Sequence, residues 1–157
     1  LLIQEGSKTA EYNGDQSVDL TLNSTTSQSL VATGVSFSSK VSRGGSSSTT
    51  TWKNYRQTLS VSGISMTSSV SADVETDSVA LGARGGSYTL STPIPVVWSS
   101  TSGNPSAGAV KVIGANNSQL VATVGAGGSV AIQIDANGDG VFEKTVPSTV
   151  AALKAAL

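Results

Sequence analysis

The fold of this chain is decided by residues 110–134, which read VKVIGANNSQLVATVGAGGSVAIQI. Apolar residues alternate with their neighbours in three short runs, at 110–112, 120–124 and 130–134. A period of two is typical of strands that bury one face, and the Asn-Asn and Gly-rich segments between the runs are typical of turns. The stretch therefore predicts three consecutive antiparallel strands.

Similar short runs continue towards the N-terminus. Val18, Leu20 and Leu22 alternate with polar residues, and further extended pieces follow up to residue 98. The alternation slips by one residue at Gly63, which predicts a bulge inside a strand over 59–66. About ten strands and one helical segment predict an all-β fold, a single antiparallel β-sandwich of jelly-roll or immunoglobulin-like type with a short C-terminal helix.

The chain of 157 residues suits one domain, 1–157. Residues 148–157 predict the helix, with Ser148 as the N-cap before an Ala- and Leu-rich end. Residues 38–51 are rich in Ser and Gly and predict a flexible loop, because such a segment buries little apolar area against its ordering entropy. Residues 1–12 start with an apolar triplet that has no partner in its own segment, and predict an extended N-terminal arm.

Composition excludes several classes of function. Of the 157 residues 45 are Ser or Thr, only 19 are charged, and the formal net charge is -1, so no basic face is available for nucleic acid. The chain has no His and no Cys, which excludes Ser-His-Asp and Cys-His nucleophiles, Cys/His zinc sites and disulfides. Without these catalytic residue types, we expect that the protein is not an enzyme. We also expect no membrane insertion of the mature chain, since no run approaches the roughly 18 apolar residues of a membrane helix.

One motif carries chemistry, the segment DANGDGVFE at 135–143. Oxygen-bearing side chains recur at its first, third and fifth positions, and a glycine follows at the sixth, where a calcium loop turns sharply. The predicted Ca²⁺ ligands are Asp135, Asn137, Asp139, the carbonyl of Val141 and Glu143. A metal-free Asn-Gly-Asp-Gly hairpin turn uses the same residues and stays open as the alternative.

This segment resembles the D-x-[DN]-x-D-G calcium loop that EF-hands, dockerins and integrin-type β-hairpin repeats share. It departs from the EF-hand at the twelfth position, where Val146 replaces the bidentate Glu. Its flanks are strand-like, so the resemblance is to the strand–loop–strand form, and it implies a structural Ca²⁺ whose last acidic ligand is Glu143.

Two weaker clusters have an ordinary structural explanation as well as a functional one. Asp73, Glu75 and Asp77 would share one face of a strand, as a second cation site or a carboxylate pair, or as a solvated face. Trp52 and Trp98 could form a sugar-stacking platform with nearby tyrosines, or belong to a core or interface.

The low-charge, Cys-free, hydroxyl-rich composition resembles that of secreted bacterial surface and fibre proteins. We therefore expect an extracellular or cell-surface protein from which a signal peptide has been removed. The predicted function is a structural, pilin-like filament subunit, with copies of itself as partner through β-strand addition and with calcium as stabiliser. The alternative is a calcium-stabilised adhesion or carbohydrate-binding module with a glycan or another surface ligand.

Overall fold

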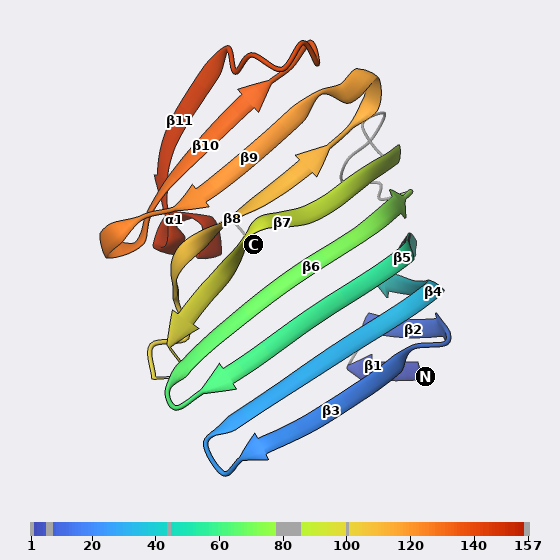
Figure 1. The fold of residues 1–157 in the computed structure, drawn as a ribbon. Coiled ribbons are helices and arrows are strands. Elements are labelled where there is room, and N and C mark those ends of the chain that lie inside the picture. Colours follow the sequence, from blue (N-terminus) through green and yellow to red (C-terminus); the bar gives the residue numbers. More distant parts are fainter. Residues whose placement is uncertain (1, 6–7, 44, 78–85, 100, 156–157) are drawn as a thin grey trace.

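The computed structural model describes residues 2–5, 8–43, 45–77, 86–99 and 101–155, and most of them lie in one antiparallel sheet (Figure 1). The strands are β1 (Leu2–Glu5), β2 (Lys8–Gly14), β3 (Ser17–Ser24), β4 (Ser27–Arg43), β5 (Ser46–Ser62), β6 (Ser65–Thr76), β7 (Gly86–Ser99), β8 (Pro105–Ile113), β9 (Gln119–Val124), β10 (Ser129–Asp135) and β11 (Lys144–Thr149). Two 3-10 turns, η2 (Ala115–Asn117) and η3 (Ala126–Gly128), and one helix, α1 (Val150–Ala155), complete the described elements.

The strands lie in the order β1-β2-β4-β5-β6-β7-β8-β9-β10-β11, and β3 pairs with β4 off this path. The predicted all-β class with one short C-terminal helix is confirmed. The eleven strands form one open sheet, however, and within the described ranges no second sheet packs on it as a sandwich would require. Figure 1 shows this sheet as a twisted fan from β3 and β4 to β10 and β11.

The N-terminal strands share one edge of β4. β3 pairs with the first half of β4, where Leu20 lies opposite Leu30, and β2 pairs with the second half, where Gly14 lies opposite Phe37. Residues 2–5 pair with β2 as a short hairpin. The segment 1–12, predicted as an extended arm, is therefore held at the sheet edge by its own chain in the residues that the structure describes.

The flexible loop predicted over 38–51 is wrong. Residues 38–43 end β4 and residues 46–51 begin β5, and the two runs pair directly, with Lys40 opposite Thr49. The ladder is built from backbone groups, so Ser and Thr can continue it without burying apolar side chains. The bulge predicted at Gly63 is also wrong, because β5 ends at Ser62 and a turn at 63–64 leads into β6.

β7 carries Pro93 and Pro95 although it lies between β6 and β8. The register with both neighbours shifts around these prolines, as expected for residues that cannot donate to a ladder. β8 comes very close there: a Cβ on Gly108 would lie 2.6 Å from the Val96 Cα, and Gly108 has a φ of +117°. Only a glycine allows this approach.

Helix α1 is capped by Thr149, whose Oγ1 accepts a hydrogen bond from the Ala152 N–H (3.1 Å), one residue beyond the predicted cap. Lys154 donates to the carbonyl of Gly103 (3.3 Å) and to Asn104 Oδ1 (2.6 Å), which ties the helix to the turn before β8. Val150 is buried.

The buried core of the described chain is small. Its apolar members are Ala32, Ala72, Val74, Ala109, Val130 and Val150. The chain exposes 9782 Å² of surface, whereas a compact monomer of 15.7 kDa exposes about 7,300 Å². The excess of about 2,500 Å² is what a one-layer sheet leaves uncovered.

Candidate functional site

The predicted calcium loop connects β10 to β11. Asp135 ends β10, lies opposite Gln119 of β9 and is fully buried, at 0% exposure. Its Oδ1 accepts a hydrogen bond from the Gly138 N–H (2.6 Å), and its Oδ2 accepts one from the Gly140 N–H (2.9 Å) and one from Gln119 Nε2 (3.3 Å). The carboxylate of Asp135 therefore organises the whole loop around itself.

The next polar residues close smaller turns. Asn137 Oδ1 accepts a hydrogen bond from the Asp139 N–H (2.9 Å), and Asp139 Oδ1 accepts one from the Val141 N–H (2.8 Å). Glu143 Oε2 reaches back to the Ala136 N–H (2.9 Å). These side chains hold the backbone in the tight coil that Asn and Asp favour in turns.

The loop brings three of the predicted ligands together. Asp135, Asp139 and Glu143 each offer a carboxylate oxygen, and these oxygens lie within 4.8 Å of one another. Calcium binds oxygens at about 2.3–2.6 Å, so oxygens on opposite sides of an ion lie about 5 Å apart, and three oxygens within 4.8 Å of one another are close enough to share one ion. Asn137 uses its amide on Asp139, with Nδ2 donating to Oδ2 (3.1 Å), and Val141 meets the cluster through its N–H.

The loop also depends on residues outside the motif. A Cβ on Gly138 would lie 2.0 Å from the carbonyl oxygen of Asn116, because the loop packs directly on the β8–β9 turn. Sequence reasoning missed Gln119, which reaches the loop through the pairing of β9 with β10, and Asn116, which reaches it from the β8–β9 turn. Only a cross-strand register could have identified them.

A second candidate site is the face of the sheet over β3 to β7. The register aligns three rows of side chains that share this face. We call it the apolar face; it consists of Leu22, Gln28, Val61, Met66 and Trp98 in the first row, Leu20, Leu30, Leu59, Ser68 and Val96 in the second, and Val18, Ala32, Gln57 and Val70 in the third.

The opposite side of the same strands is the hydroxyl face. Its intervening rows contain Thr21, Ser29, Ser60 and Thr67, and then Asp19, Val31, Thr58 and Ser69. An antiparallel sheet with one apolar and one polar side is built to be covered on the apolar side and solvated on the other. In the described residues, however, these strands contact chiefly their sheet neighbours, and α1 contacts β11.

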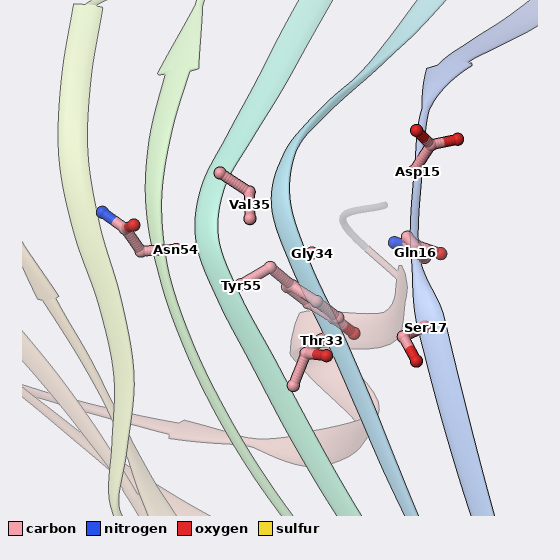
Figure 2. Close-up of a pocket in the computed structure, with 8 residues that line it drawn as sticks. All are labelled: Asp15, Gln16, Ser17, Thr33, Gly34, Val35, Asn54 and Tyr55. Atoms are coloured by element: carbon pink, nitrogen blue, oxygen red, sulfur yellow. The ribbon is translucent and has the colours of Figure 1, made fainter.

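The sheet bends where β4 changes its partner from β3 to β2, and a shallow pocket lies at the bend (Figure 2). Figure 2 shows Tyr55 reaching from β5 across β4 towards Ser17, while Asn54 lies on the other side of β5. The Tyr55 hydroxyl donates to Gln57 Oε1 (2.7 Å), and desolvation by burial raises the pKa of Tyr55 above its ordinary value of 10.0.

The structure places most residues of the two weaker clusters in contact with sheet neighbours, whereas Trp98 lies apart from Trp52, opposite Met66. Trp52 stacks on Phe37, with ring centroids 6.2 Å apart, and Tyr55 meets both rings edge-on, so these aromatics pack on one another. Glu75 pairs with Lys53 at 2.6 Å, and Asp73 accepts a hydrogen bond from Asn54 Nδ2 (2.7 Å). Cross-strand partners thus engage the carboxylates of β6.

No helix among the described residues is long and apolar enough to cross a membrane. Comparisons of the chain with protein-family models, with curated proteins and with solved structures find no match.

Proposed function

We propose that this chain is a structural subunit that self-assembles into an extracellular or cell-surface filament, with calcium stabilising its last hairpin. The observation that carries the proposal is the open, one-layer sheet, which leaves an apolar face and strand edges uncovered. A chain of this length normally buries more of its surface, and self-association supplies the missing cover.

The edges of the sheet differ in how well they are protected. Among the described strands, β1, β3 and β11 pair on one side only. β11 carries Lys144 and Pro147, which are typical of edges that resist further pairing, and β1 is only four residues long. β3 has eight residues and neither Lys nor Pro, so it is the edge best suited to accept a strand from the next subunit.

The N-terminal segment is the strand we assign to that contact. β1 joins its own sheet through four residue pairs, so its release costs few hydrogen bonds. Addition of this strand to β3 of the next copy is head-to-tail, and a head-to-tail contact that does not close on itself produces a filament. The hydroxyl-rich, low-charge composition supports the extracellular location.

Negative-stain electron microscopy of the purified chain in calcium tests this function. We expect filaments, and we expect an excess of a synthetic peptide of residues 1–12 to shorten them by occupying the β3 edge. A scrambled peptide of the same composition is the control. Filaments that ignore the peptide would contradict strand addition by this segment, and a preparation without any assemblies would contradict the function itself.

A further inference from the structure

We propose that the apolar face of one chain stacks on the apolar face of a second copy, so that two one-layer sheets form one sandwich across a two-fold axis. This inference rests on the proposed function, because it names one of the surfaces through which copies associate. It is a different contact from strand addition: it uses side chains of β3 to β7, whereas strand addition uses the backbone of β3.

The first step is the exposure of the face. On the edge strand β3, Val18, Leu20 and Leu22 are 56%, 57% and 67% exposed. Further along the same rows, Leu30, Leu59 and Met66 are half-buried by their strand neighbours. A contiguous exposed apolar patch of this kind marks an interaction site, because monomeric proteins rarely expose one.

The surface area that one chain leaves exposed also favours a second copy as the partner. The chain exposes about 2,500 Å² more than a compact monomer of its mass, and a pair of chains therefore has about 5,000 Å² of excess surface to bury. Obligate homodimer interfaces bury about 2,000–5,000 Å² in total. This excess is spread over both faces and the edges of the sheet, and a contact that buries half of it, about 2,500 Å² in total, still falls within that range.

The charge of the side chains on the apolar face also favours a second copy. The three rows of the apolar face contain no Asp, Glu, Lys or Arg, and their polar members are two glutamines and one serine. In a two-fold contact every residue near the axis meets its own copy, so a charge there would be repelled by the same charge. A face without charged side chains meets itself without like-charge repulsion, and the net charge of -1 adds little repulsion between chains.

The fourth step is the fit between two sheets. Aligned sheets stack about 10 Å apart with their apolar side chains interdigitated, and the angle between them arises from their own twist. The rows of the apolar face mix large side chains such as Leu59 and Trp98 with the small Ala32 and Ser68, which lie buried between their larger neighbours. Such a mixture of sizes lets facing rows interlock.

Thiol labelling tests the contact cleanly, because the natural chain has no Cys. Thr58 and Leu59 are neighbours in β5, both half-buried, and point to opposite faces. In full-length Leu59→Cys, maleimide labelling should slow about tenfold as the protein is concentrated from the micromolar to the 100 µM range, because mass action fills the face. Full-length Thr58→Cys is the matched control and should label at a concentration-independent rate.

A second pair of variants guards against misfolding. Leu20 and Thr21 are adjacent and exposed on β3, so a charge at either position leaves the fold intact, as far-UV circular dichroism will check. In sedimentation velocity, Leu20→Glu should lose face-to-face association and Thr21→Glu should keep it. Strand addition through the β3 backbone would treat the two variants alike.

The outcomes separate the two proposals. Concentration-dependent protection of Leu59→Cys alone, with loss of the dimer in Leu20→Glu alone, supports the stacked face. Self-association that persists while both thiols label at constant rates overturns the stacked face and leaves the filament function standing. A wild-type chain that never associates overturns both.

Discussion

At the scale of single residues, the 135–143 loop is held by one buried carboxylate and one close backbone contact. Asp135 accepts hydrogen bonds from two loop amides and from Gln119, and Gly138 lies against the Asn116 carbonyl with no room for a side chain. The acidic cluster is therefore formed by the fold of the loop, in which Asp139 and Glu143 are brought to Asp135.

Gly138→Ala should destabilise the protein more than Gly140→Ala. Both glycines have positive φ, +78° and +87°, so both variants bear the cost of a left-handed backbone, about 1 kcal/mol. Only at Gly138 would the new Cβ lie 2.0 Å from the Asn116 oxygen, whereas Gly140 faces open space. We expect an additional loss of about 1–3 kcal/mol for Gly138→Ala, measured by urea unfolding. Equal losses would contradict the tight packing of the loop on the β8–β9 turn.

At the scale of elements, the last hairpin and the bent pair β4–β5 have separate physical roles. In the hairpin β10–β11, the loop at one end of β11 carries the acidic cluster, and α1 begins at the other end. The bend in β4 lets a single strand serve two partners, β3 and β2, on the same edge.

Calcium should raise the melting temperature of the protein. Binding to the folded state alone at 100 times the dissociation constant adds about 2.7 kcal/mol, which in a domain of this size corresponds to roughly 5–10 °C. Glu143→Gln is the matched variant, because it keeps an oxygen that can accept the Ala136 N–H and removes a charge from the cluster. We expect it to unfold normally in EDTA and to lose most of the calcium shift in calorimetry. A wild-type melting curve identical in calcium and EDTA would show that the loop is a metal-free turn.

Alkaline pH should reveal the burial of Tyr55. Its pKa is raised by desolvation, so the unfolded chain loses this proton at a lower pH than the folded chain does. The stabilising effect of the neutral hydroxyl is complete below pH 10 and is lost as pH rises through the folded-state pKa. The melting temperature of wild type should therefore fall more steeply above pH 10 than that of Tyr55→Phe. A wild-type curve that runs parallel to that of Tyr55→Phe above pH 10 would contradict the burial of this hydroxyl.

At the scale of the whole molecule, the alternation of apolar and polar residues predicted where the strands lie better than it predicted how many sheets they form. The runs over 110–134 became β8, β9 and β10 with the predicted turns between them. Each run shows that a strand has an apolar side, but no run specifies whether the same chain covers that side. The expected sandwich therefore became one open sheet.

The errors along the chain have local causes. The hydroxyl-rich residues 38–51 lack a burial signal, yet they extend β4 and β5 through backbone pairing. Ile64 is 64% exposed in a turn, and its apolar side chain made the β5–β6 hairpin resemble one bulged strand. In the loop, spacing alone identified Asp135, Asp139 and Glu143, whereas Gln119 depends on a register that sequence spacing does not contain.

We propose that one chain supplies one layer of a two-layer molecule, which further copies of the chain complete. Sedimentation velocity of the wild-type chain in calcium, over about 1–100 µM, measures this self-association, since association follows mass action. We predict that the weight-average mass rises with concentration from the 15.7 kDa monomer to a dimer and beyond. A single 15.7 kDa species at every concentration would contradict it.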